Sequence, residues 1–405
     1  MLTSFFQLYK NAYTGLSRNS WYLSIVMLIN RSGTMVVPFM SIYCIQQLHF
    51  TVIQAGFVMA LFGVGAISGS FVGGKLTDKI GFYDLQVGAL LTGGVLFIIT
   101  GYLHTFITLC AGTFVLSFCN ESVRPANSTA IAHYSTPENK TRSYSLNRLA
   151  INLGWAFGAG LGGIIAAINY HLLFWVDGTT NIFAALMLLK LMPRAHILTG
   201  IKKVNKAIKS ASAYRDGTYL LFILFTTLFS ISFFQLFIME PVFYKLEWHF
   251  NERLIGALMA LNGLMIVAVE MVLIHNLEGK RNAIIYIYIG VTLAAIDFAM
   301  LNTLPAGLVA GIAVVIVITV AEMLAMPFMN AFWINRTSDN NRGQYAALYS
   351  MSWSAAQILA PLIGGFAISY GGFRMLWWGL ALLCTASATG FYFLYRYTSR
   401  PKGLS

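Results

Sequence analysis

Four ionisable residues lie in the middle of long apolar stretches of this chain: Arg31, Glu121, Arg124 and Glu322. An ionised side chain near the centre of a hydrocarbon layer costs about 2.5–3.5 kcal/mol, so each of these residues requires a chemical explanation. A carboxyl group in such a place can bind and release a proton, and a nearby guanidinium can balance the charge when the proton leaves. Residue type and position therefore predict proton binding in an apolar environment.

Glu121 and Arg124 are three positions apart, so both project from one face of the same helix. A carboxylate beside a guanidinium stays ionised, and the pair costs less to bury than either charge alone. One interpretation is a permanent ion pair that fixes helix packing. The other is that Glu121 or Glu322 carries a proton, with Arg31 and Arg124 as counter-charges. Glu322 has no partner charge in its own stretch, which favours the second interpretation for that residue.

Further polar residues are secondary candidates for the same chemistry. Asn30 precedes Arg31, and Arg148 lies about one helical turn inside the start of the fifth apolar stretch. Asp177 and Asp297 lie toward the ends of the sixth and ninth stretches, where we expect them to be hydrated. The seven histidines all lie outside the middle of the stretches, which disfavours a histidine proton relay.

Glu240 stands beside Pro241 at the end of the seventh stretch, and either an outer gate or a structural role fits that position. Aromatic residues of the seventh and tenth stretches are candidates for a soft, adaptable surface that suits apolar, aromatic or cationic ligands; they are Phe233, Phe237, Tyr244 and Phe328. Packing against lipid and neighbouring helices would use the same residues. The sequence therefore leaves both interpretations open for them.

The composition excludes an ordinary soluble protein. Of the 405 residues, 58% are hydrophobic and only 10% are charged, and the mean hydropathy is +0.70. The apolar residues come in blocks without a period of two, which is typical of lipid-embedded helices and not of barrel strands. We therefore predict an all-α polytopic membrane protein, located in the cell (inner) membrane.

Twelve stretches are long enough to cross a bilayer, since about 20 residues at 1.5 Å rise span roughly 30 Å. They are residues 21–44, 52–73, 84–104, 106–132, 143–168, 171–191, 217–243, 253–276, 282–302, 305–332, 343–369 and 373–395. The first stretch is too long for the apolar region of a signal peptide, so we expect no cleaved leader. Nearly all Lys and Arg residues between stretches fall on one side, which places both termini in the cytoplasm.

The net charge of +12 follows from that topology and from attraction to anionic lipid, so no nucleic-acid partner is needed. Residues 192–216 form a basic cytoplasmic linker between residues 1–191 and 217–405, each with six stretches. The two parts also resemble one another. The run from Gly154 to Gly163 in the fifth stretch has a counterpart from Ala360 to Gly365 in the eleventh.

The segment Gly74-Lys75-Leu76-Thr77-Asp78-Lys79-Ile80-Gly81 joins the second and third stretches. It resembles the loop between helices 2 and 3 of the major facilitator superfamily of secondary transporters, with Gly74, Asp78, Lys79 and Gly81 in place. The family usually continues with two basic residues, whereas this chain has Phe82 and Tyr83. The resemblance implies two pseudo-symmetric six-helix bundles with spans one, four, seven and ten around a central cavity.

Two further patterns bear on the branch of that family. The glycines from Gly154 onward look like a motif of proton-driven exporters, although Ala159 replaces its proline; plain helix packing explains them equally well. The acid-bearing tenth span is similar to that of proton-coupled peptide transporters. Asn30-Arg31 with Asn147-Arg148 looks closer to the drug:proton antiporter branch.

We therefore expect a monomeric proton-coupled exporter of amphiphilic small molecules that uses the proton gradient and no cofactor. Its partners are the substrate, protons and the lipid bilayer. Proton-coupled uptake of a small polar solute such as a peptide or sugar is the alternative, and a membrane receptor is a remote one. Neither a nucleotide-binding loop nor a zinc-protease motif is present, so we expect no enzyme, and the four cysteines lack metal-ligand spacing.

Overall fold

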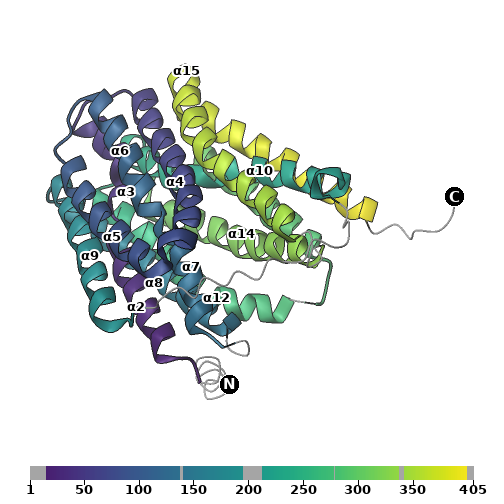
Figure 1. The fold of residues 1–405 in the computed structure, drawn as a ribbon. Helices are drawn as coiled ribbons and strands as arrows, with labels where there is room; N and C mark the ends of the chain where they lie inside the picture. The colour runs from purple at the N-terminus through teal and green to yellow at the C-terminus, as the bar shows by residue number, and fades with distance from the viewer. Residues whose placement is uncertain (1–14, 137–139, 195–211, 278, 337–341, 399–405) are drawn as a thin grey trace, which may run out of the picture. The chain divides into compact units, whose positions relative to one another are not determined.

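The computed structural model describes residues 15–136, 140–194, 212–277, 279–336 and 342–398 (Figure 1). Within these ranges the secondary structure is helical, with no β-strand. Eleven helices are long and apolar enough to cross a membrane, and the last of them is two helices joined at Gly371 and Gly372. Gly372 has φ +66°, which suits glycine and interrupts the helix. This confirms the predicted all-α fold of twelve spans.

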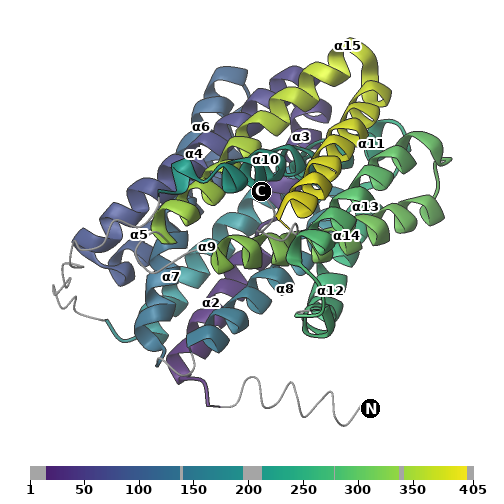
Figure 2. The same ribbon diagram turned by 90° about the vertical axis from the view of Figure 1, so that its right-hand side faces the viewer.

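The first half of the chain contains eight helices in the described ranges. They are α2 (Arg18–Ser32), α3 (Val36–Gln46), α4 (Val52–Ile80), α5 (Phe82–Thr100), α6 (Phe106–Glu121), α7 (Val123–Tyr134), α8 (Lys140–Ala166) and α9 (Tyr170–Leu191). The second half contains a 3-10 turn and six α-helices, which can be followed in Figure 2. They are η1 (Ala213–Arg215), α10 (Gly217–Ile238), α11 (Glu240–Leu246), α12 (Glu252–Leu277), α13 (Ala283–Thr303), α14 (Leu308–Asn335) and α15 (Arg342–Thr398).

Capping residues mark where several of the helices begin. The apolar stretches show little periodicity, so the apolar pattern alone does not define these positions. The side chains of Ser17, Thr105, Asn169, Asp216 and Asn282 each accept a hydrogen bond from a backbone N–H in the following first turn. An N-cap of this kind satisfies one of the donors that the first turn leaves without a helical partner. Four of these residues fall within a few positions of a predicted span boundary.

Three spans are broken, and each break lies beside an ionisable residue named above. The first span breaks at Gly33–Met35, directly after Arg31. The fourth breaks at Ser122, between Glu121 and Arg124. The seventh breaks at Met239, directly before Glu240. The tenth span, α14, continues through Pro327 as one helix.

The described residues group into two compact units. Of these residues, the first unit comprises 15–48, 61–136, 140–194 and 251–267, and the second comprises 49–60, 212–250, 268–277, 279–336 and 342–398. The start of α12 therefore groups with the first unit, and the start of α4 groups with the second. Most of the predicted linker, residues 195–211, lies outside the described residues, so the division at 192–216 stays a prediction.

Equivalent glycines make the same backbone contact in the two units. A Cβ on Gly256 would lie 2.6 Å from the carbonyl oxygen of Ala159 in the first unit. A Cβ on Gly56 would lie 2.6 Å from the carbonyl oxygen of Pro361 in the second. His49 and His249 also share a left-handed backbone, with φ 56° and 54°. This supports the internal duplication that the glycine-rich runs indicated.

Candidate functional site

An ion-pair cluster occupies the first unit where α2, α6 and α7 end or begin. Arg31 Nη1 lies 3.8 Å from Glu121 Oε1, and both side chains are buried. Arg124 Nε pairs with the other oxygen, Glu121 Oε2, from a side chain that is 60% exposed. Arg31 Nε has no hydrogen-bond partner among the described residues. One carboxylate thus lies between a buried and an accessible guanidinium.

The breaks in the spans position this cluster. Ser122 keeps helical angles (φ −65°, ψ −17°), so the interruption of the fourth span is slight and Glu121 and Arg124 keep the i, i+3 spacing of one helix face. The Ser70 hydroxyl donates a hydrogen bond to the Glu121 carbonyl oxygen at 3.2 Å. A Cβ on Gly73 would lie 2.8 Å from Ser122, so only glycine lets α4 approach this closely. Helix α4 thereby fixes the position of the Glu121 backbone.

The glycines of the fifth span pack against the first. A Cβ on Gly154 would meet the Arg31 Cβ at 2.7 Å, and one on Gly158 would meet the Arg31 carbonyl oxygen at 3.1 Å. Gly163 instead faces α12, where a Cβ would lie 2.3 Å from the Glu252 carbonyl oxygen. Close helix packing is therefore one observed role of this run, and it holds Arg31 in place.

Asn30 and Asp177 form a second buried network in the first unit. Asn30 Nδ2 donates to Asn181 Oδ1 at 2.9 Å, and Asn181 Nδ2 donates to the Asp177 carbonyl oxygen at 2.8 Å. The Asp177 carboxylate accepts the backbone N–H groups of Met35 at 3.0 Å and Val36 at 2.8 Å. Asp177 therefore caps the start of α3. The backbone N–H groups donate to its carboxyl group the hydrogen bonds that water would donate at an exposed site.

The expected hydration of Asp177 and Asp297 is wrong, because both residues have 0% exposure. Asp297, on α13 in the second unit, lies near Glu240, which is also buried and interacts electrostatically with it. Helix packing brings these two acids together although 57 positions separate them in the sequence. No local pattern indicates this pairing, because each acid stands alone among the apolar residues of its own span.

Two further predicted ionisable residues are Glu322 and Arg148. Glu322 lies on α14 in the second unit and is partly exposed, and Arg148 is exposed on α8. The predicted role of Glu322 as a proton carrier stays a prediction.

The predicted cavity aromatics gather only in part. Phe233 and Phe237 pack ring to ring at 5.5 Å, and Trp353 of α15 lies 5.7 Å from Phe233. Tyr244 packs instead on Trp248 at 5.3 Å, and Phe328 packs on Tyr286 at 4.5 Å. Trp353 was not among the predicted residues. It is an aromatic residue of the eleventh span, and the aromatic residues of the seventh span could have indicated it as a partner.

The motif segment from Gly74 to Gly81 is mostly helix. Helix α4 extends to Ile80 and α5 begins at Phe82, so the reversal uses Gly81 alone, with φ +96°. The predicted loop is therefore a one-residue turn, because glycine permits that angle. Lys79 is exposed, and a Cβ on Gly74 would lie 4.0 Å from Pro125. The side chain of Asp78 lies outside the described part of the chain.

A polar cluster in the second unit was missed. The Asp216 carboxylate caps α10 and accepts hydrogen bonds from Arg336 Nη2 and the Tyr345 hydroxyl, both at 2.8 Å. Burial acts to raise the pKa of Asp216, but the hydrogen bonds from Arg336, Tyr345 and Tyr219 outweigh it and lower the pKa. The hydrogen bond from Arg336 to Asp216 correspondingly raises the pKa of Arg336. The position of Asp216 directly before an apolar stretch indicates a helix cap. Its partners Arg336 and Tyr345 are too far away in the sequence to be predicted from that position.

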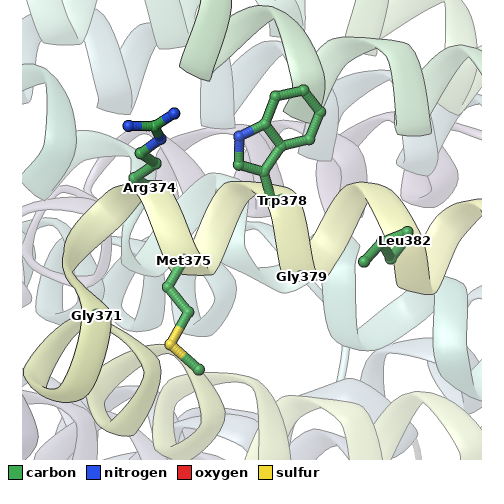
Figure 3. Close-up of a pocket in the computed structure, with 6 residues that line it drawn as sticks. All are labelled: Gly371, Arg374, Met375, Trp378, Gly379 and Leu382. Carbon is green, nitrogen blue, oxygen red and sulfur yellow. The ribbon is translucent and has the colours of Figure 1, made fainter.

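A shallow depression follows one face of α15 and is lined by Gly371, Arg374, Met375, Trp378, Gly379 and Leu382 (Figure 3). Figure 3 shows Arg374 and Trp378 projecting from the same side of the helix. Met375, Trp378 and Leu382 are all exposed. Exposed apolar side chains on a spanning helix, ended by an Arg and a Trp, are typical of a lipid-facing surface. None of the residues predicted for the site lies there.

Comparison with known proteins decides the family. The sequence model described as Major Facilitator Superfamily matches residues 23–338. The chain belongs to the Major Facilitator Superfamily. It is therefore a multi-pass membrane transporter and not an enzyme, as the residues from Gly74 to Gly81 predicted.

Several relatives among curated proteins are distant but match most of the chain. It is 21% identical to the uncharacterized MFS-type transporter YqjV of Bacillus subtilis (strain 168), over 87% of each chain. It is 23% identical to multidrug resistance protein 2 of the same organism, over 82% of this chain and 84% of the relative. Among solved structures, the nucleoside transporter NupG shares the fold with a TM-score of 0.75 and 14% identity, covering 94% of this chain and 100% of NupG.

Proposed function

We propose that this transporter is a proton-coupled exporter of amphiphilic small molecules that works by alternating access in the cell membrane, with both termini in the cytoplasm. The observation that carries the proposal is the placement of Glu121 between Arg31 and Arg124 at a break in the fourth span. Binding of one proton to this carboxylate would change the net charge of the three-residue cluster.

Proton binding to Glu121 would remove the negative charge that holds the two guanidiniums. The buried Arg31 would then lose its ion-pair partner, which is unfavourable in an apolar region. The adjoining breaks at Ser122 and Gly33–Met35 give the helices room to respond. Protonation thus has a mechanical consequence, because the same residue pairs with two helix segments. Glu322 would take this role if Glu121 is a permanent ion pair.

The substrate class rests on the aromatic cluster and on one relative. Phe233, Phe237 and Trp353 form a soft apolar surface that suits aromatic or cationic amphiphiles. A relative covering most of the chain is named a multidrug resistance protein. Both features favour export of amphiphiles over uptake of a strongly polar solute such as a peptide or sugar.

Everted membrane vesicles test the direction and the driving force together. Vesicles with the protein should accumulate cationic dyes when the interior is acidic, and accumulation should stop when an ionophore collapses the pH gradient. Vesicles without the protein provide the control. Gradient-dependent uptake of peptides or sugars by right-side-out vesicles, without dye accumulation by everted ones, would instead establish the uptake alternative.

A further inference from the structure

Two buried acids of the second unit lack the partners that other buried acids have. Glu121 is paired with arginines, Asp177 accepts backbone N–H groups, and Glu252 accepts the Tyr170 hydroxyl at 2.8 Å. For Glu240 and Asp297, by contrast, no Lys, Arg or His of the described residues forms an ion pair. Both Asp297 oxygens and Glu240 Oε2 also lack any hydrogen-bond partner among those residues.

The unpartnered atoms concentrate around this pair. The Tyr244 hydroxyl interacts with Glu240 without reaching hydrogen-bond geometry, and it has no other partner in the described chain. The indole N–H of Trp377 is also buried and unpartnered there. Its ring stacks on Phe298, the neighbour of Asp297, at 6.1 Å and contacts Phe243 at 5.3 Å. Several unsatisfied buried polar atoms in one region indicate a bound proton, ion or water.

The surroundings favour a proton. Two carboxylates that interact in an apolar region cannot both stay ionised without large cost, because each disfavours the charge on the other. The titratable neighbours are Tyr244 on α11 and Cys384 on α15, and neither is a cation. Phe243, Phe298 and Trp377 cover the region with apolar rings. A proton held by the pair removes one charge and requires no ligand cage.

We propose that Glu240 and Asp297 form a proton-binding site of their own, in which the two carboxyl groups hold at least one proton. Glu240 lies on α11 and Asp297 on α13, and both helices can be followed in Figure 2. Glu240 is the first residue after the break at Met239, so movement of α11 would separate the carboxyl groups. The separated groups would each gain access to water and release the proton. This site is distinct from Glu121 and Glu322 and does not depend on either of them.

Chemical labelling of the purified full-length wild-type protein tests the site without measuring transport. A hydrophobic carbodiimide reacts with protonated carboxyl groups in apolar surroundings, and peptide mass spectrometry locates the adduct. At pH 7 the label is expected on Glu240 or Asp297. Asp84 is the internal control: its carboxyl group is exposed and pairs with Arg194, so it should stay unlabelled.

A second measurement covers the case in which the reagent does not reach the pair. The infrared band of protonated carboxyl groups at pH 7 should weaken in the double variant Glu240→Gln/Asp297→Asn and stay unchanged in the surface variant Asp84→Asn. The proposal is overturned if neither acid is labelled and the band persists in the double variant. It is equally overturned if sodium chloride, compared with choline chloride, blocks labelling at constant pH, because the occupant would then be a sodium ion.

Discussion

The carboxylate of Asp177 accepts a hydrogen bond from the backbone N–H of Val36 at 2.8 Å, so an acid of the sixth span caps the broken first span. The same helix α9 holds Asn30 through Asn181. The break therefore has a fixed geometry, and Arg31, which lies between Asn30 and the break, has a fixed direction toward Glu121. The hydrogen bond of Asn30 and the ion pair of Arg31 therefore involve adjacent residues at the end of α2.

Asp177→Asn should lower the thermal midpoint of the detergent-solubilised protein. Asparagine offers one acceptor oxygen where Asp177 offers two to the backbone N–H groups of Met35 and Val36. A buried backbone donor left without its hydrogen bond costs about 1–3 kcal/mol. Asp84→Asn alters an exposed ion pair with Arg194 and should change stability by less than about 0.5 kcal/mol. Equal midpoints for both variants would contradict the capping role.

Asp216→Asn should destabilise the protein at neutral pH and have less effect in acid. The folded state lowers the pKa of Asp216, so its contribution is present above the unfolded pKa of about 3.9 and is lost as pH falls through the folded pKa. The difference in midpoint between wild type and variant should therefore shrink toward pH 3–4. Arg336→Lys keeps the charge but loses the two-point contact, and should reproduce part of the effect. A difference that grows in acid would refute the assignment.

Gly163→Ala should disturb the contact between α8 and α12. The new Cβ would lie 2.3 Å from a backbone oxygen, and overpacking of this kind costs roughly 1–3 kcal/mol. Gly88→Ala is the matched control, because a Cβ there meets nothing within 4 Å. We expect a lower midpoint for the first variant and an unchanged or slightly higher one for the second. The contact has no energetic importance if the two behave alike.

Trp353→Leu should weaken substrate binding. An aromatic pair contributes about 0.5–1.5 kcal/mol beyond its buried area, which corresponds to a roughly two- to tenfold rise in the KM for dyes. Trp378→Leu removes a tryptophan from the exposed face of α15 and should leave the KM unchanged. Thermal midpoints of both variants separate binding from stability. An unchanged KM for Trp353→Leu would remove the aromatic cluster from the substrate site.

The sequence predicted the features that depend on composition and local order. The twelve spans follow from the apolar blocks, whereas the helix caps and the confinement of the turn to Gly81 are seen only in the structure. The pair of Glu121 and Arg124 was also predictable, because helical spacing places residues three apart on one face.

What depends on packing between distant segments was not predictable. Asp177 and Asp297 look alike in the sequence, as single acids near the ends of apolar spans. Their environments differ because a broken helix faces one and another acid faces the other. The partners of Asp216 lie about 120 positions away, so no local pattern contained them.

Proton coupling is tested most directly in proteoliposomes by comparing dye transport driven by a pH gradient with dye exchange at equal pH. We expect Glu121→Gln or Glu322→Gln to abolish gradient-driven transport and to retain exchange, because the variant still binds substrate but cannot bind and release the proton. Full gradient-driven transport by the double variant Glu121→Gln/Glu322→Gln would contradict the proposed mechanism.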